Sequence, residues 1–307
     1  MTPDISVIIP TFRRPEGLHR AVTSILAQAN PCGLTIELVV VDNDPEGSAR
    51  DAVETLSRDA AMPVHYVHAR DPGVANARNA GLAKATGEFI AFLDDDEEAP
   101  AAWLCEMLGE QRFHEADVVF GPVLARLPDD IRAHRAYYAE FFSREGPEES
   151  GVIDHYYGCG NSLVRRAALP DRDEVFSASR NDIGGEDDLL FAELKANGAR
   201  FAWCAEAFVW EDPLMSRTRL GYTLRRAFAY GQGPSAACAA ASPANLAGIV
   251  YWMMIGAGQF AVFGSLALVL WLTRAPHRAR MLDKAIRGLG KLLWGGPFKL
   301  RFYGAAA

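Results

Sequence analysis

Five carboxylates in a row, residues 94–98, directly follow five apolar residues, 89–93. The apolar run lies between Gly87 and Pro100, and so short a run predicts a strand that is buried on both faces. Like charges this close repel one another by roughly 1 kcal/mol per pair in water, and by more at a lower dielectric. Ligands of open α/β sheets bind at the carboxyl ends of strands. The run therefore indicates either a cation site or a solvated acidic turn.

A second acidic group, residues 186–188, follows Gly184 and Gly185. An amphipathic helical pattern begins there and ends at Gly198, a residue that suits a helix C-cap. Carboxylates in a first helical turn interact favourably with the helix dipole, by about 0.3–1 kcal/mol each. Helix capping is therefore one interpretation, but two glycines and three acids are more than capping needs.

Two further segments place a polar side chain of interest among small residues. Residues 71–81 open a helix in which Gly73 can take an unusual backbone angle and Arg78 lies among small residues. Arg78 is therefore either a charge on the helix surface or a ligand contact. In residues 158–162, two glycines flank a cysteine and precede Asn161. Glycines so placed either let backbone amides approach a substrate or form a plain turn.

The elements that must position these residues alternate along the chain. Strands are predicted at 5–9, 36–41, 64–67 and 89–93, with helices at 15–28, at 48–58 and opening within 71–81 between them. A further strand is predicted at 117–123. The alternation predicts an α/β fold with a parallel sheet and right-handed crossovers. The patterns GxGxxG and GxxxxGK[ST] are both absent, so the dinucleotide and P-loop mechanisms are not supported.

Charge is divided unequally between the two ends of the sequence. Residues 1–213 carry 19 basic and 38 acidic side chains, a net of −19, whereas residues 214–307 carry 12 and 1, a net of +11. The basic part indicates a membrane or polyanion partner. The acidic part would repel nucleic acid, so we expect no nucleic-acid binding. Five widely spaced cysteines without a CxxC pair favour a reducing compartment, and the N-terminus lacks the pattern of a signal peptide.

A long apolar segment, residues 246–272, lies within a stretch from 227 to 273 that contains no Asp, Glu, Lys or Arg. As one helix it would be about 40 Å long, more than the ~30 Å hydrocarbon core of a bilayer. Basic residues flank it on both sides, which favours a re-entrant hairpin with its turn at Gly256 and Gly258, or an in-plane insertion. A single span and a buried helix of a soluble protein remain alternatives. Residues 281–293 predict a basic amphipathic helix on anionic lipid.

Six short motifs together resemble family 2 inverting glycosyltransferases with a GT-A fold, of the exopolysaccharide type that includes succinoglycan glucosyltransferases. Each motif is weak alone, but their order and spacing are specific. The motifs are residues 6–13, 41–44, 73–79, 92–96, 160–161 and 185–188. The resemblance covers roughly residues 5–231. It implies a mixed, mainly parallel sheet flanked by helices, followed here by a C-terminal membrane-associated helical segment.

The resemblance implies a role for each matching residue. Asp187 would be the catalytic base, with Glu186 beside it. Asp96 would ligate a metal ion, and Asp94 would contact the ribose or support the metal. The nucleotide sugar would be held by the remaining matches, which are Pro10, Thr11, Arg13, Asp42, Arg78, Asp94, Asp95 and Asn161. Glu97 and Glu98 are expected to form a solvated turn, and a role for Glu211, where relatives often have a histidine, stays open.

The chemistry of these residues agrees with such roles independently. A diphosphate leaving group in a domain of net charge −19 needs a divalent cation, and Mg²⁺ or Mn²⁺ suits carboxylate ligands. Inversion at the anomeric carbon needs one carboxylate to take the proton of the acceptor hydroxyl. Nothing in the sequence indicates the nucleophile that a retaining double displacement would need. We therefore expect metal-dependent, inverting hexosyl transfer from a nucleotide sugar, in particular a UDP-sugar.

We expect a catalytic domain at 1–231 and a membrane-inserted part at 232–307, with the catalytic domain on the cytoplasmic side of the inner membrane. This location implies a lipid-linked acceptor, a polyprenyl-diphosphate saccharide, in the synthesis of extracellular or cell-surface polysaccharide. The sequence does not indicate an oligomeric state. One alternative is a non-catalytic, membrane-tethered scaffold of a polysaccharide assembly complex. Another is a nucleotidyltransferase that makes sugar nucleotides, although the basic glycine-rich triphosphate loop of such enzymes is not visible.

Overall fold

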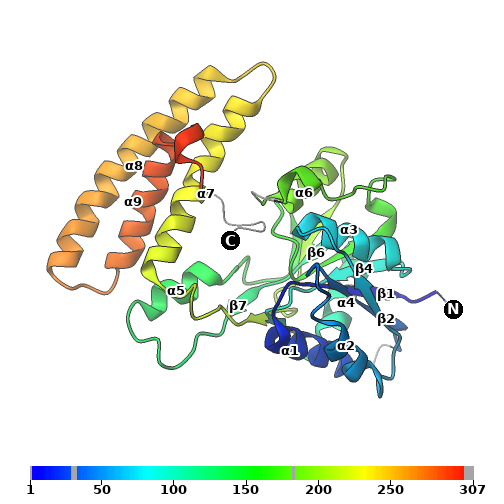
Figure 1. The fold of residues 1–307 in the computed structure, drawn as a ribbon. Helices are drawn as coiled ribbons and strands as arrows, with labels where there is room; N and C mark the ends of the chain where they lie inside the picture. The colour runs from blue at the N-terminus through cyan, green and yellow to red at the C-terminus, as the bar shows by residue number, and fades with distance from the viewer. Residues whose placement is uncertain (1, 29–32, 182–183, 301–307) are drawn as a thin grey trace. The chain divides into compact units, whose positions relative to one another are not determined.

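The computed structural model describes residues 2–28, 33–181 and 184–300. They form two compact units, residues 2–126 with 143–212 and residues 127–142 with 213–300 (Figure 1). All six motifs have described residues in the first unit, and the apolar segment lies in the second. The units divide after residue 212, whereas the sequence analysis ends the catalytic domain at residue 231. The functional division at 231 stays a prediction.

The first unit is built around a sheet of eight strands in the order β3-β2-β1-β4-β9-β6-β10-β8. Strands β1 to β4 pair in parallel, whereas β9 is antiparallel to β4 and β6, and β8 to β10. The predicted mixed, mainly parallel α/β fold is confirmed. The bounds are β1 (Ile5–Thr11), β2 (Ile36–Asp42), β3 (Val64–His68), β4 (Phe89–Phe92), β6 (Val118–Phe120), β8 (Gly151–Ile153), β9 (Ser162–Arg165) and β10 (Phe201–Trp203).

The alternation alone predicts a purely parallel sheet, and this prediction is wrong for β8 and β9. Strand β9 runs antiparallel to both of its neighbours, β4 and β6, and β8 runs antiparallel to β10 at the edge of the sheet. The strand predicted at 117–123 is also two strands, because Gly121 and Pro122 separate β6 from β7 (Val123–Ala125). A proline cannot donate to a ladder, so the break falls there.

A second sheet of three strands lies beside the acidic run. Its order is β5 (Glu97–Glu98), β11 (Val209–Glu211) and β7. Glu97 is only 3% exposed, and its carboxylate accepts a hydrogen bond from the Asp94 backbone N–H at 2.9 Å. The prediction of a solvated turn is therefore wrong for Glu97. Glu211 pairs with Glu97 across the antiparallel ladder, which places the undecided position 211 next to the acidic segment.

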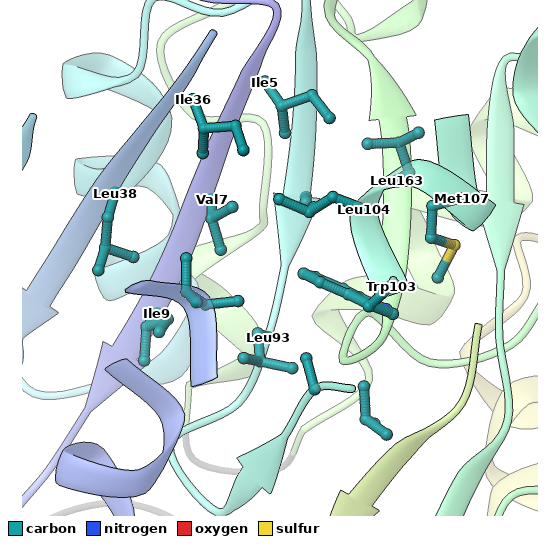
Figure 2. Close-up of a cluster of buried hydrophobic side chains, with 14 of the residues drawn as sticks. Ile5, Val7, Ile9, Ile36, Leu38, Leu93, Trp103, Leu104, Met107 and Leu163 are labelled. Atoms are coloured by element: carbon teal, nitrogen blue, oxygen red, sulfur yellow. The ribbon is translucent and has the colours of Figure 1, made fainter. Parts of the chain in front are cut away.

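Helices cover both faces of the large sheet because the inner strands are apolar on both faces. Ile5, Val7 and Ile9 face one cluster, which α1, α2 and α4 complete (Figure 2). Ile8 faces the opposite cluster with α3 and α6. This alternation is the period of two expected of a strand. The helices are α1 (Pro15–Leu26), α2 (Arg50–Ser57), α3 (Val74–Lys84), α4 (Trp103–His114) and α6 (Glu186–Ala196), with short 3₁₀ turns η1 (Arg166–Ala168) and η2 (Ala178–Arg180).

The second unit is helical. It contains α5 (Arg135–Phe142), α7 (Leu220–Ala240), α8 (Leu246–Leu272), α9 (Arg278–Leu292) and the 3₁₀ turn η3 (Gly296–Phe298). Helix α8 is continuous through Gly256 and Gly258, so the predicted hairpin turn at these glycines is wrong. Gly256 instead packs against α9, where an added Cβ would lie 2.6 Å from the Gly288 carbonyl oxygen. Small residues at this contact allow two helix backbones to approach closely.

Candidate active site

The acidic run is fastened to the end of β1. Strands β1 and β4 are parallel neighbours, so their carboxyl ends meet at one edge of the sheet. Thr11 Oγ1 donates to Asp95 Oδ2 at 2.8 Å, and Arg14 forms ion pairs with Asp95 Oδ1 at 3.0 Å and with Asp96. Asp95 is 7% exposed. It therefore joins the two strand ends and holds the loop that carries Asp94 and Asp96.

Burial makes this group of carboxylates costly to ionise. It raises the pKa of Asp95 to about 6, although the Arg14 guanidinium opposes the rise. Burial also raises the pKa of Glu97, and the neighbouring Asp94 raises it further. The pKa of Asp94 is raised by burial and, to a smaller extent, by Asp96, while Arg78 lowers it. A cation bound here would relieve this repulsion.

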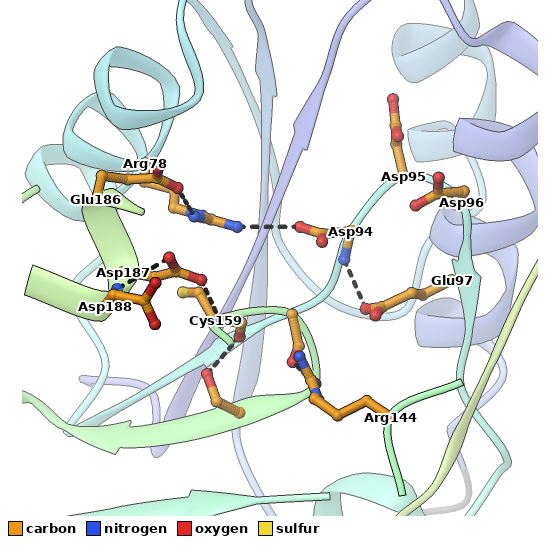
Figure 3. Close-up of polar contacts among 12 residues, drawn as sticks. Arg78, Asp94, Asp95, Asp96, Glu97, Arg144, Cys159, Glu186, Asp187 and Asp188 are labelled. Atoms are coloured by element: carbon orange, nitrogen blue, oxygen red, sulfur yellow. Dashed lines mark hydrogen bonds and ion pairs between the residues drawn. The ribbon is translucent and has the colours of Figure 1, made fainter. Parts of the chain in front are cut away.

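Arg78 connects the acidic run to the second acidic group (Figure 3). Its guanidinium forms ion pairs with Glu186 at the start of α6 and with Asp94 Oδ1, the latter at 3.4 Å. Arg78 is 5% exposed and lies over the Phe176 ring, 5.6 Å from its centroid. The small residues of α3 make this burial possible, since an added Cβ on Gly81 would lie 2.6 Å from Ile8. The interpretation of Arg78 as a helix-surface charge is wrong.

Asp187 is held at the opposite side of the same site. The backbone N–H of Cys159 donates to Asp187 Oδ2 at 3.0 Å. Gly158 and Gly160 are needed here because side chains crowd both positions. An added Cβ on Gly160 would lie 2.7 Å from Asp94 Oδ2, and one on Gly158 would lie 3.3 Å from Asp187 Oδ2. The interpretation of a plain turn is therefore wrong, because this loop lets two carboxylates approach its backbone.

Arg144 is a site residue that the sequence analysis misses. It follows α5, in a region whose sequence pattern indicates no chemistry. Its guanidinium donates to the Gly160 carbonyl oxygen and lies 2.8 Å from where a Cβ of Gly158 would be. Its Nε is buried without a hydrogen-bond partner in the described part of the chain. Figure 3 shows Arg144 on the side of the loop where Asp94 and Glu97 lie.

A cavity of about 290 Å³ opens beside the end of β1. Two of its lining residues, Arg13 and Asp44, form a hydrogen-bonded ion pair at 3.0 Å. This hydrogen bond lowers the pKa of Asp44 to about 2. Asp44 is a further residue that the sequence analysis did not single out, although its motif was recognised. The lining residues are Thr11, Arg13, Arg14, Pro15, Leu18, Asp44, Ser48, Ala49 and Ala52. Pro10 precedes this wall within β1, opposite Val41 of β2.

Asp42 and Asn161 are fully buried. The oxygens of Asp42 accept hydrogen bonds from the backbone of Asp44 and Ala49 and from the Tyr66 hydroxyl, at 2.7–3.0 Å. Asn161 accepts from Trp103 Nε1 at 2.7 Å and donates to two backbone carbonyls, those of Pro122 and Ala207. In this structure both side chains bind the protein itself. Their predicted contact with the nucleotide sugar stays a prediction.

The described residues contain no preassembled group of three or more His, Cys, Asp or Glu side chains that could hold a metal ion. Asp96 pairs with Arg14 and Asp94 with Arg78. The donor chemistry nevertheless fits a hard divalent cation, because carboxylate oxygens suit Mg²⁺ and Mn²⁺, which commonly take their remaining ligands from phosphate and water. The raised pKa values of Asp94 and Glu97 agree with such a fit.

Comparison with known proteins identifies the family of this chain. Residues 6–172 match the family described as Glycosyl transferase family 2. This chain belongs to glycosyl transferase family 2. The glycosyltransferase is 32% identical over 296 residues to the succinoglycan biosynthesis protein ExoM of Rhizobium meliloti, covering 94% of this chain and 92% of ExoM. It is also similar to a Campylobacter jejuni GalNAc(5)-diNAcBac-PP-undecaprenol beta-1,3-glucosyltransferase, at 34% identity over 49% of this chain and 46% of that one.

Solved structures support the GT-A-like fold of this family 2 glycosyltransferase. The mannosyltransferase PcManGT from Pyrobaculum calidifontis, in complex with GDP-Man and Mn²⁺, aligns with a TM-score of 0.62 over 96% of this chain and 88% of its own, at 19% identity. S. aureus TarS 1-349 in complex with UDP-GlcNAc aligns with a TM-score of 0.54 over 94% and 90%, at 18% identity. Identities this low establish the fold alone.

Proposed function

We propose that this glycosyltransferase moves a sugar, with inversion, from a UDP-sugar to a lipid-linked polyprenyl-diphosphate saccharide in the synthesis of extracellular or cell-surface polysaccharide. The observation that carries the proposal is the placement of Asp187 and the Asp94–Asp96 loop on two sides of one site, with Arg78 between them. A base on one side and a place for a diphosphate on the other are what inversion requires. The name of ExoM supports a role in polysaccharide synthesis, and the name of the Campylobacter enzyme, which includes PP-undecaprenol, supports the acceptor class.

In the proposed reaction Asp187 takes the proton of the acceptor hydroxyl as that oxygen bonds to the anomeric carbon. The bond from this carbon to the diphosphate breaks on the opposite face, so the configuration inverts. The Cys159 N–H orients the Asp187 carboxylate for this step. Arg78 and Arg144 supply positive charge next to the leaving diphosphate, and Arg13, Thr11 and Pro10 line the nucleoside side.

We assign the divalent cation, Mg²⁺ or Mn²⁺, to Asp96 with Asp94, and when bound it would neutralise charge on the departing diphosphate. The Mn²⁺ in the PcManGT complex supports the use of a divalent cation. Because Asp96 pairs with Arg14 in this structure, cation binding has to compete with that ion pair. We therefore expect Asp96→Ala to abolish the metal dependence of UDP binding in calorimetry. Glu98→Gln, at the outer end of the run, should keep it.

The central test compares two neighbouring carboxylates on α6. Asp187→Asn should lower transfer at least about a hundredfold, the scale of general-base catalysis, and leave UDP binding unchanged. Asp188→Asn is the matched control, since this side chain is exposed one residue further along, and it should keep near wild-type transfer. Transfer by Asp187→Asn at the wild-type rate would overturn the assignment of the base.

The donor and the two competing functions are tested together by incubating the protein with UDP-, GDP- and dTDP-sugars and a divalent cation. Release of UDP supports glycosyl transfer. Formation of a sugar nucleotide from a sugar phosphate and a nucleoside triphosphate would instead show the nucleotidyltransferase. A protein that releases no nucleoside diphosphate from any donor, with lipid-linked acceptor present, would be the non-catalytic scaffold.

We also propose that the protein is attached to the cytoplasmic side of the inner membrane through its second unit. Helix α8 is long and apolar enough to cross a membrane, by length and composition. Basic residues on both sides of it, from Arg217 to Arg226 and from Arg274 onwards, support a cytoplasmic location of both flanks. The cysteines of the described residues are free, as is usual in a reducing compartment.

A further inference from the structure

The surface of α8 is apolar along its whole length. Leu246, Val250, Met254, Val262 and Leu272 are each between 57% and 77% exposed. Their spacings of 4, 4, 8 and 10 residues place them on one side of the helix. Single exposed apolar residues are common on soluble proteins, but a continuous stripe of this length marks an interaction surface.

The opposite side of α8 is covered by α9, which runs antiparallel to it. Gly256 meets Gly288, the Lys284 ammonium lies 5.2 Å from the Phe263 ring, and the Arg278 guanidinium lies 5.5 Å from the Trp271 ring. Lys291 donates to Gln259 at 3.0 Å. The cations of α9 are thus spread beside the second half of α8, from its middle to its end.

A transmembrane orientation conflicts with this register. Gln259 is the central residue of the 27 in α8, so a perpendicular α8 would place Lys291 and Lys284 near the middle of the hydrocarbon core. Cations at that depth are costly, and the one acid on α9, Asp283, already accepts from Arg287 and Tyr137. At about 40 Å, α8 is also longer than the ~30 Å core.

We propose that α8 lies flat in the surface of an anionic bilayer and does not cross it. Its exposed apolar face then enters the boundary between headgroups and acyl chains, while the lysines and arginines of α7 and α9 stay at the level of the lipid phosphates. The excess of positive charge commits the partner to anionic lipid, because residues 214–300 hold 11 basic and 1 acidic side chains. The inference rests on the membrane attachment proposed above and is independent of the reaction.

Orientation is tested on the full-length protein bound to vesicles of phosphatidylcholine and phosphatidylglycerol. A fluorescent amino acid is placed at Val250, Val262 or Val269, and quenching is compared for lipids brominated near the headgroup or near the chain end. A flat helix predicts the same shallow depth at all three positions. Deep quenching at Val262 with shallow quenching at the other two would show a span and overturn the inference.

The contribution of the basic residues to membrane binding is tested by flotation with the same vesicles. Replacing Arg280 and Lys284 by Gln should weaken binding by about fivefold for each cation removed, since each contributes about a factor of five at an anionic surface. Arg58→Gln, on the exposed surface of the first unit, is the matched control and should not change binding. Equal binding to purely zwitterionic vesicles, or a dimer that hides all three fluorescent positions from lipid, would contradict the proposal.

The same samples separate this inference from the proposed function. UDP release from a donor sugar is measured for every variant, because these positions lie outside the site and should leave it unchanged. If the protein releases UDP but shows deep quenching at Val262 only, the flat orientation of α8 is refuted and the proposed reaction is not. One that binds flat but releases no UDP would refute the proposed reaction alone.

Discussion

Arg78 is the residue on which the geometry of the site depends. It comes from α3 and pairs with Glu186, 108 positions later in the chain, and with Asp94. Because it is buried, removing it would leave two carboxylates without their cation. Position 78 therefore couples the carboxylates assigned to the metal with the helix that carries the proposed base.

We predict that Arg78→Met lowers the free energy of unfolding by about 3–5 kcal/mol, the usual cost of breaking a buried ion pair. The double variant Arg78→Met with Glu186→Gln should recover part of this loss, because it removes one of the two stranded charges. Urea unfolding followed by circular dichroism measures both. A double variant no more stable than the single one would contradict this account of the pair.

A second prediction concerns Asp95 and pH. Its pKa is raised from 3.8 to about 6 in the folded protein, so its contribution to stability is greatest at low pH and is lost as pH rises through about 6. Without divalent cation, the melting temperature of the wild type relative to Asp95→Asn should therefore rise on acidification from about pH 7 to about pH 5. Comparison with the variant cancels the groups that titrate in both proteins. If the difference in melting temperature between the wild type and Asp95→Asn does not change with pH, the raised pKa of Asp95 is contradicted.

At the scale of elements, glycines determine how the helices of the second unit pack. An added Cβ on Gly231 of α7 would lie 2.2 Å from the Arg287 carbonyl oxygen, and one on Gly290 of α9 would lie 2.2 Å from that of Phe228. Gly256 and Gly288 form the corresponding contact between α8 and α9. Helix α9 therefore packs closely on both neighbours, so the basic helix predicted at 281–293 is part of a helical bundle, and its contact with anionic lipid stays a prediction.

This packing predicts opposite effects for two glycines of one helix. Gly256→Ala should destabilise the helical unit by about 1–3 kcal/mol, because its Cβ would overlap the α9 backbone. Gly258→Ala meets nothing within 4 Å and should stabilise it by up to about 1 kcal/mol through helix propensity. Thermal unfolding in detergent, with limited proteolysis of the second unit, measures both. If Gly256→Ala and Gly258→Ala change the stability of the unit equally, the close packing of α8 on α9 at Gly256 is contradicted.

At the scale of the whole molecule, charge is separated along the chain. The first 213 residues have a net charge of −19 and the remainder +11. An anionic membrane would attract the basic part and repel the acidic part. The same separation keeps a negatively charged nucleotide sugar away from the active site unless a cation accompanies it. In the proposed reaction the lipid-linked acceptor is therefore attracted by the basic part, whereas the nucleotide sugar approaches the acidic part together with a cation.

We therefore predict that salt affects the two partners differently. Raising the ionic strength from about 0.05 M to about 0.5 M should lower transfer to a lipid-linked acceptor in anionic vesicles several-fold, because surface charges are screened beyond a few ångströms. Binding of UDP with its divalent cation, measured by calorimetry at the same salt concentrations, should change less. If UDP binding weakens as much as transfer, the effect does not arise at the membrane.

The sequence by itself determined the features that repeat locally or lie close together in the chain. These are the alternation of strands and helices, the carboxylates after β4 and in the first turn of α6, the family motifs, and the long apolar segment followed by basic residues. Each depends on residue type and short spacing, and short-range patterns determine such elements directly.

Only the tertiary structure decided which of these residues share a site and which are buried. It placed Arg78 between Asp94 and Glu186 and brought Arg144 from an unassigned loop to the Gly160 carbonyl. It buried Glu97 in the second sheet, next to Asp94 and paired with Glu211. It also kept α8 continuous by packing its central glycine against α9. These outcomes depend on contacts between residues that are far apart in the chain. Strand register and helix packing bring such residues together, and no local sequence pattern encodes either of them.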